Sequence, residues 1–284
     1  MTFRPDLLLA HDFGKARQRY EARDAILYAL GLGLGCDPLD EGDLAYLDET
    51  RLAVIPSFAV TLCSPGLWIR DPAFGVDFAR LVHSAQEARF HALLPASAEV
   101  SGTARVLAVR DRGEGRGAVV ELERELRDAD DGGLYCTLKQ TLLLRGNGGF
   151  GGEPPARLPS AIPASDPATS AALKLSPRAA LIYRLSGDWN PLHIDPAFAS
   201  KAGFERPIMH GLGTYGMAGV AVSRAVGRNP SDMTRLACRF AGIVYPGDML
   251  DLSIWPEERS ARFQAHIGER VVLDEGVIEW NNEP

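Results

Sequence analysis

The chain has 284 residues, of which 46% are hydrophobic and 24% charged, and a formal net charge of -7 at pH 7. These values are typical of a globular protein with about two domains. The acidic balance argues against a nucleic-acid partner, which needs clustered positive charge. No apolar stretch reaches the roughly 18 residues that cross a bilayer, so we expect no membrane partner and a cytoplasmic location. The four cysteines form no Cys-x-x-Cys pair, which argues against a zinc site.

The first half of the chain has the pattern of helices followed by antiparallel strands. Residues 20–30 show helical spacing and end next to glycines, and residues 56–63 could form a second, short buried helix. Alternating apolar and polar residues, separated by Asp- and Gly-rich turns, predict three strands. These strands are expected at residues 98–110, 118–126 and 134–145.

A glycine-rich run followed by five prolines, over residues 146–167, is the clearest break in the sequence. Glycine widens the allowed backbone conformations and proline removes amide donors, so this segment cannot continue a helix or a strand ladder. We therefore predict an N-terminal unit over residues 1–146, a linker over 147–172 and a C-terminal unit over 173–284.

The second half is predicted to contain a helix at residues 211–226 that is rich in glycine and alanine. Small side chains allow such a helix to lie close against a surrounding sheet. A short helix is expected at 196–202, where Asp195 and Pro196 form a good helix start. Four further strands are expected at residues 236–244, 249–255, 262–267 and 271–280. Each half therefore resembles an α+β unit.

The side chains suited to catalysis lie in the segment 183–195. Within it, Gly187 and the proline after Asn190 predict a loop. Asp188, Asn190 and His193 are its candidate catalytic residues. A carboxylate and an imidazole that converge on one water can polarise it, one accepting a proton while the other donates. Asp and Asn are also common turn formers, but a turn requires neither the histidine nor its spacing.

Gly211 is a candidate binding residue for a second reason. It follows the segment Arg206-Pro-Ile-Met-His and begins the predicted small-residue helix. Backbone amides at a helix start are unpaired and carry partial positive charge. A glycine there lets a ligand oxygen approach the amide, which suits the oxyanion of an enolate derived from a thioester.

Several segments together resemble the MaoC-like hydratase family, in the two-domain form found in the hydratase domain of peroxisomal multifunctional enzyme type 2. The run Gly-Asp-Trp-Asn-Pro-Leu-His at 187–193 is the most specific of them. The run Tyr-Ala-Leu-Gly at 28–31 and the glycine-rich segment distinguish the two-domain form from the single-domain one. The other similar segments are residues 52–60, 207–212 and 239–246.

The resemblance implies a double hot-dog fold, in which each of two curved antiparallel sheets wraps a central helix. It implies (R)-specific, reversible hydration of trans-2-enoyl-CoA to (3R)-3-hydroxyacyl-CoA, a hydro-lyase reaction that needs neither a cofactor nor a metal ion. Asp188 and His193 match the family's acid/base pair, Asn190 its positioning amide and Gly211 its thioester-binding amide. Less specific matches predict further substrate contacts at His83, Ser84, Arg112, Trp189, Pro191, Leu192 and Phe240. A homodimer is also compatible with this resemblance.

Two other functions stay open at this point. A hot-dog acyl-CoA thioesterase would also bind an acyl-CoA, but such enzymes place a carboxylate on or beside the central helix. Residues 211–226 contain no Asp or Glu, which disfavours hydrolysis. A non-catalytic acyl-CoA-binding subunit is the second alternative, and the intact Asp-Asn-His set argues against it. The sequence leaves the acyl chain and the pathway undetermined.

Overall fold

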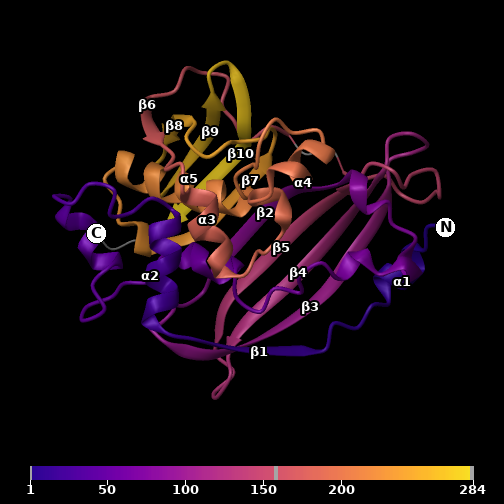
Figure 1. Cartoon of the computed structure of the whole chain (residues 1–284), viewed down its shortest axis with the longest axis horizontal. Helices are drawn as coiled ribbons and strands as arrows, with labels where there is room; N and C mark the ends of the chain where they lie inside the picture. Colours follow the sequence, from indigo (N-terminus) through magenta and orange to yellow (C-terminus); the bar gives the residue numbers. More distant parts are fainter. Residues whose placement is uncertain (1, 157–158, 282–284) are drawn as a thin grey trace.

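The structure, a computed structural model, describes residues 2–156 and 159–281. Within them, ten strands form one antiparallel sheet in the order β1-β3-β4-β5-β2-β7-β10-β9-β8-β6 (Figure 1). The first half of the chain supplies β1 (Lys15–Tyr20), β2 (Leu81–Phe90), β3 (Ala98–Asp111), β4 (Ala118–Asp128) and β5 (Leu134–Leu144). The second half supplies β6 (Thr169–Lys174), β7 (Met233–Phe240), β8 (Met249–Pro256), β9 (Ser260–Ile267) and β10 (Arg270–Trp280).

The two halves are joined through the pairing of β2 with β7. Ala85 lies opposite Arg239 and Arg89 opposite Arg235, so the central strand of each half completes the hydrogen-bond ladder of the other. Buried side chains from both halves also form one hydrophobic core. Residues of the N-terminal half can therefore reach a site built on the C-terminal half.

Five α-helices lie among the described residues. They are α1 (Pro5–Leu9), α2 (Ala22–Gly31), α3 (Ala179–Tyr183), α4 (Pro196–Lys201) and α5 (Gly211–Ala225). Short 3-10 helices occur at η1 (Glu41–Tyr46), η2 (Pro56–Val60), η3 (Trp68–Arg70), η4 (Pro72–Phe74), η5 (Phe78–Arg80), η6 (Arg184–Ser186), η7 (Pro191–His193) and η8 (Pro230–Asp232). In Figure 1, α2, α3 and α5 lie on the same side of the sheet.

Helix α5 is the central helix of the C-terminal half and contacts β6, β7, β8 and β9. Its glycines allow this close packing, because a Cβ added at Gly219 would come within 2.8 Å of Leu236. In the N-terminal half, the five-residue η2 is buried and contacts β2, β7 and α5. The α+β double hot-dog prediction is confirmed, and among the described residues of the N-terminal half no α-helix is as long as α5.

All seven predicted strands and the predicted helices at 20–30, 196–202 and 211–226 are present with small shifts of their ends. The sequence did not indicate β1, β2 or β6. Because β6 begins at Thr169 and pairs with β8, the end of the range predicted as linker belongs to the sheet. No helix in the described part of the chain is long and apolar enough to span a membrane.

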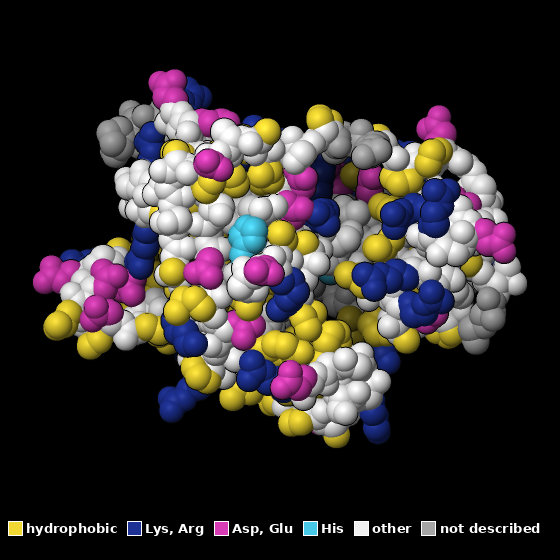
Figure 2. Space-filling view, turned by 90° about the horizontal axis from the view of Figure 1, so that it is seen from above, with side chains coloured by type: hydrophobic (Ala, Val, Ile, Leu, Met, Phe, Trp, Pro, Cys, Tyr) yellow, Lys and Arg dark blue, Asp and Glu magenta, His cyan; other side chains and the backbone are white. Residues whose placement is uncertain are grey.

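The molecular surface carries charges of both signs. Figure 2 shows acidic and basic side chains interspersed over one face, with hydrophobic side chains gathered around a hollow. The formal charge of -7 is thus spread and, on this face, does not form one acidic patch.

Candidate active site

The loop between α3 and α4 is shaped by its own side chains. Gly187 ends η6 with a φ of 114°, a conformation that suits glycine. The Asn190 N–H donates to Asp188 Oδ1 at 3.2 Å, and Asn190 Oδ1 accepts from the Leu192 N–H at 3.1 Å. Pro191 then starts η7, which ends at His193. The local turn chemistry thus holds Asp188 exposed and His193 buried on one short segment.

The hydrogen bonding of His193 fixes its tautomer. Its Nδ1 lies 2.9 Å from the backbone carbonyl of Ile208, which can only accept, so Nδ1 carries the proton in the neutral ring. The lone pair of Nε2 then remains available. Burial lowers the pKa of His193, partly opposed by the bond to Ile208 and by the charge of Asp188. His193 is therefore a neutral imidazole able to accept a proton near neutral pH.

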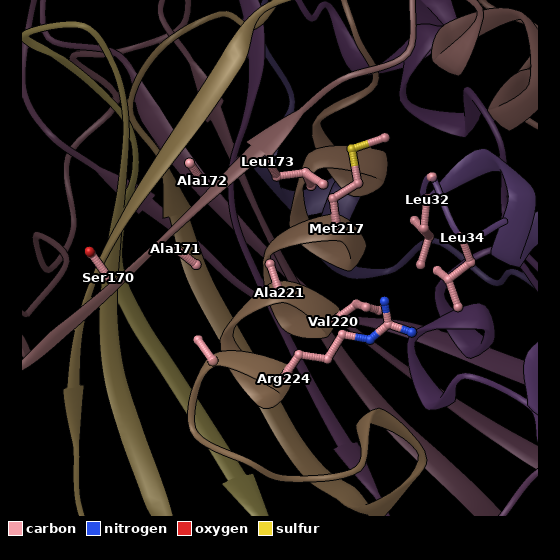
Figure 3. Close-up of a pocket in the computed structure, with 12 residues that line it drawn as sticks. Leu32, Leu34, Ser170, Ala171, Ala172, Leu173, Met217, Val220, Ala221 and Arg224 are labelled. Atoms are coloured by element: carbon pink, nitrogen blue, oxygen red, sulfur yellow. The ribbon is translucent and has the colours of Figure 1, made fainter. Parts of the chain in front are cut away.

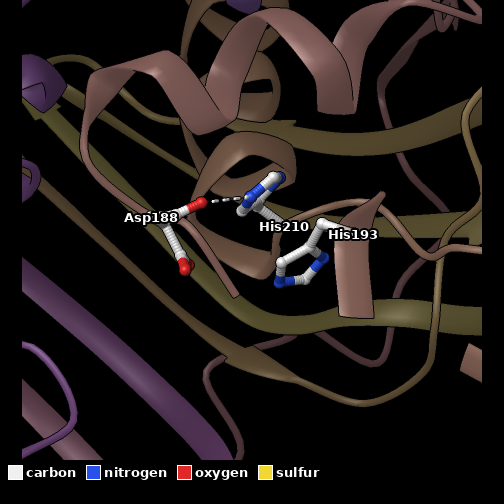
Figure 4. A group of neighbouring side chains, drawn as sticks. All are labelled: Asp188, His193 and His210. Atoms are coloured by element: carbon white, nitrogen blue, oxygen red, sulfur yellow. Dashed lines mark hydrogen bonds between the residues drawn. The ribbon is translucent and has the colours of Figure 1, made fainter. Parts of the chain in front are cut away.

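A second histidine completes a cluster with the loop residues (Figure 4). The His210 ring stacks on the His193 ring, with 3.7 Å between centroids and 26° between planes. Its Nε2 donates to the Asp188 backbone carbonyl at 3.3 Å. A carboxylate oxygen of Asp188 and one ring nitrogen of each histidine all lie within 4.8 Å of one another. Two hydrogen bonds to a shared water span up to about 5.6 Å, so this spacing suits a single bridging water.

The cluster also has the donor types of a metal site, since neutral imidazoles and carboxylates ligate transition metals. One nitrogen of each ring is already used on a backbone carbonyl, at Ile208 and Asp188. The remaining donors can serve a water equally well. The expectation of a metal-free reaction therefore stays a prediction.

Helix α5 begins directly after His210, at Gly211. Among the described residues, the Gly211 N–H makes no hydrogen bond to another backbone group. A Cβ at this position would meet the Phe240 ring at 3.3 Å, so Phe240 stands beside the exposed amide. The helix start thus presents a free donor next to the Asp-His pair, as expected for an oxyanion site.

Comparison with known proteins gives the chain two adjoining family matches. Residues 18–146 match the MFE-2 hydratase 2 N-terminal domain and residues 160–277 match the MaoC like domain. The chain is 40% identical over 280 residues to 3-hydroxyacyl-thioester dehydratase Y of Mycobacterium tuberculosis, covering 91% of this chain and 92% of the relative. It is 35% identical to the peroxisomal enoyl-CoA hydratase 2 of Arabidopsis thaliana, covering 94% and 92%.

The chain belongs to the MaoC-like hydratase family. Solved structures agree with this assignment. A MaoC-like dehydratase from Phytophthora capsici superposes with a TM-score of 0.83 at 28% identity, covering 98% of this chain and 99% of that one. The full-length peroxisomal multifunctional enzyme type 2 of Drosophila melanogaster gives a TM-score of 0.77 at 29% identity, covering 94% of this chain and 48% of that one.

In this family member, the N-terminal half contributes His83 to the wall of the site. A register shift between His83 and Ala85 marks a β-bulge in β2, a feature that re-aims side chains beside active sites. His83 Nε2 donates to the Ala85 carbonyl at 3.0 Å, and Nδ1 accepts from Gln140 at 3.3 Å. Both ring nitrogens are engaged in these hydrogen bonds, so His83 presents a carbon edge of its ring. The centroids of the His83 and Phe240 rings are 4.9 Å apart. Burial lowers the His83 pKa to about 4.

Three other predicted substrate contacts occupy less direct positions. The Ser84 hydroxyl donates to the Thr141 carbonyl at 3.1 Å, within the sheet. Arg112 is exposed and donates to the Arg116 carbonyl in the turn after β3. In the strand order, β3 lies three strands away from β2. Three strand spacings separate β3 from His83 by about 14 Å. Trp189 is 57% exposed, and the Arg184 guanidinium stacks 4.4 Å from the centre of its ring.

Pro191 and Leu192 lie on η7 between Asn190 and His193, Pro191 exposed and Leu192 half-buried. Their contact with substrate stays a prediction, as do those of Trp189 and Arg112. The structure adds two residues that sequence reasoning did not assign, His210 and Gln140. His210 had one signal, its place directly before Gly211, whereas Gln140 is recognisable only through the pairing of β5 with β2.

A separate pocket of about 410 Å³ lies along α5 (Figure 3). Leu32 and Leu34 from the N-terminal half line one side of this pocket, and the strand β6 lines another side. Residues Met217 to Ala225 of α5 form its floor. Met217 is six residues from Gly211, or about 9 Å along the helix axis. This pocket is therefore distinct from the cluster at the helix start.

The buried histidines predict how stability depends on pH. Burial, followed by the neighbouring His193, lowers the pKa of His210 to about 3. Unfolding restores a pKa near 6.5, so the unfolded chain binds more protons between these values. The free energy of unfolding should fall by a few kcal/mol as pH falls from about 6.5 to 4. Urea unfolding at several pH values should show that the free energy of unfolding depends less steeply on pH in His210→Asn than in the wild type. An unchanged pH dependence would contradict its origin in His210.

Proposed function

We propose that this hydro-lyase adds water to trans-2-enoyl-CoA and forms (3R)-3-hydroxyacyl-CoA, with Asp188 and His193 activating the water. One observation carries the proposal. The Asp188 carboxylate and a buried His193 ring nitrogen lie within 4.8 Å of each other, beside the free amide that starts α5. The relatives' names, enoyl-CoA hydratase 2 and 3-hydroxyacyl-thioester dehydratase, support the same reaction class.

In the proposed reaction, the thioester oxygen accepts a hydrogen bond from the Gly211 N–H. This bond withdraws electrons from the conjugated system and stabilises negative charge that builds toward C2. A water held by Asp188 and His193 attacks C3, and His193 Nε2 accepts the water proton. The Asp188 carboxylate stabilises the imidazolium formed in this step. The proton is then delivered to C2, so the overall change is the addition of H and OH across one face of the double bond.

Asn190 is assigned a positioning role. Its Oδ1 already caps η7 by accepting from Leu192, so its Nδ2 is the group left to face the water or the thioester. The reverse dehydration uses the same groups, because the same transition state serves both directions. A coenzyme A thioester is the only small partner that the scheme requires. The cytoplasmic location and the homodimer remain predictions, and relatives in this family include enzymes named peroxisomal.

The purified protein should hydrate crotonyl-CoA and decenoyl-CoA, seen as loss of the conjugated enoyl thioester absorbance. The product should be oxidised by a 3R-specific 3-hydroxyacyl-CoA dehydrogenase and left untouched by a 3S-specific one. Activity should survive dialysis against EDTA, because no step uses a metal ion. Release of free thiol, followed with a colorimetric reagent, should stay at background. Thiol release without hydration would replace the proposal with a thioesterase.

A further inference from the structure

A buried arginine stands in the N-terminal half, close to the site but outside the proposed chemistry. Arg124 lies on β4, whose inward-facing side chains are otherwise apolar, as at Leu122 and Leu126. Only 8% of Arg124 is exposed. Charged side chains are almost never buried to this extent unless they are paired.

Within the described residues, Arg124 has no carboxylate partner. Its one hydrogen bond runs from Nη2 to the Val60 carbonyl at 2.8 Å, and its Nε is buried without any partner. The nearby thiols do not compensate the charge, because burial raises the pKa of Cys136 to about 12 and also raises that of Cys63. Burial lowers the Arg124 pKa to about 10, so the guanidinium stays charged at pH 7. A buried cation without a counter-ion calls for an anion from elsewhere.

Arg124 lines a small cavity of about 40 Å³ that adjoins the site. Gln86 and Gln140 also line this cavity, and Gln140 donates to the His83 ring. Leu212, the residue after Gly211, forms another wall. The cavity is therefore lined at once by Arg124, by Leu212, which follows the amide proposed to hold the thioester oxygen, and by Gln140, which contacts His83.

The dimensions of the cavity restrict what can enter it. One water-sized group needs roughly 10–15 Å³, so 40 Å³ holds about three such groups, the size of a carboxylate. The nucleotide of coenzyme A is far too large, so only the acyl end of the substrate can point here. In the pairing of β4 with β5, Gln140 lies opposite Leu122 and Leu138 lies opposite Arg124. Arg124 is therefore displaced from Gln140 by two residues, or about 7 Å, along the strand direction.

We infer that Arg124 is a specificity-determining residue that binds a carboxylate at the far end of a short acyl chain. The inference rests on the proposed hydratase function and adds to it a preference for enoyl-CoA substrates whose short chain ends in a carboxylate. Arg124 donates in a fixed fork that matches a carboxylate, and the partner would supply the missing acceptors for Nε and the remaining N–H groups. The two glutamines would hydrogen-bond the same oxygens.

The test compares trans-2-enedioyl-CoA thioesters of five to eight carbons with their terminal carboxamides, and crotonyl-CoA serves as a neutral reference. Wild-type protein should show at least a tenfold higher kcat/KM for one carboxylate length than for its carboxamide. Arg124→Met keeps the buried bulk but removes the charge, and should lower kcat/KM for that carboxylate about 100-fold. The same variant should change crotonyl-CoA turnover less than about threefold, and Arg124→Lys should retain part of the preference.

Arg127→Met is the matched control, because Arg127 lies on the same strand and pairs with Glu125 at the surface. Equal wild-type rates for carboxylate and carboxamide would overturn the inference while leaving the hydratase function intact. An equal loss for all substrates in Arg124→Met would also overturn it and reduce Arg124 to a support for η2. If Arg124→Met does not fold, the inference is decided by the ratio of the wild-type kcat/KM values for the carboxylate and its carboxamide. If the wild-type protein hydrates none of these thioesters, the proposed hydratase function itself is wrong.

Discussion

Asp188→Asn and His193→Gln each lower kcat for enoyl-CoA hydration by about two to four orders of magnitude, the range found for general acid/base groups. Asparagine keeps the size of Asp188 but cannot stabilise an imidazolium by charge. Glutamine at 193 can still fill the ring's space, yet it cannot accept the water proton. The two variants together should lose little more than either alone, because both residues act on one water.

The loss should not come from unfolding. Asp188 is exposed, and its side chain makes one local hydrogen bond, to the Asn190 N–H. Thermal unfolding and circular dichroism should therefore match the wild type closely for Asp188→Asn. Asp251→Asn and His91→Gln, the same chemical changes at exposed positions on and beside other strands, should leave kcat unchanged. Near-normal hydration by both active-site variants would refute the assignment of the water-activating pair.

Gly211→Pro lowers kcat about 100- to 1000-fold, the effect of removing one oxyanion donor. Gly211 is the first residue of α5, where proline is well tolerated because its missing N–H has no partner within the helix. The preceding residue, His210, has a φ of -62° and a ψ of 130°, an extended conformation that a following proline favours. The substitution therefore removes the donor and keeps the helix start.

Gly211→Ala is the control for the Cβ that both substitutions add. Both variants place a Cβ about 3.3 Å from Phe240, so both require the ring to move by a few tenths of an ångström. Only the proline variant lacks the N–H. We expect Gly211→Ala to keep most of kcat, with its main effect on KM, measured by steady-state hydration of crotonyl-CoA. Equal kcat for Gly211→Pro and wild type would show that the thioester oxygen is held by another group.

Local patterns in the sequence predicted the elements that keep their own periodicity. Strand β5 alternates cleanly, and the burial of Cys136, Leu138 and Leu142 on one face follows that alternation. The strand β2 carries no such pattern, and its register with β5 shifts at a bulge between His83 and Ala85. Its place at the centre of the sheet depends on partners that lie far away in the chain.

The loop 183–195 and the glycine at 211 were recognisable as a candidate site from the sequence alone, since turn formation, capping and the spacing of Asp188 and His193 are local properties. Only the tertiary structure decided the tautomer of His193, through Ile208, and the stacking of His210 on it. It also decided the isolation of Arg124, an arginine that reads as an ordinary strand residue until β4 is paired and covered. Burial and cross-strand partners arise from long-range packing, which short sequence patterns do not record.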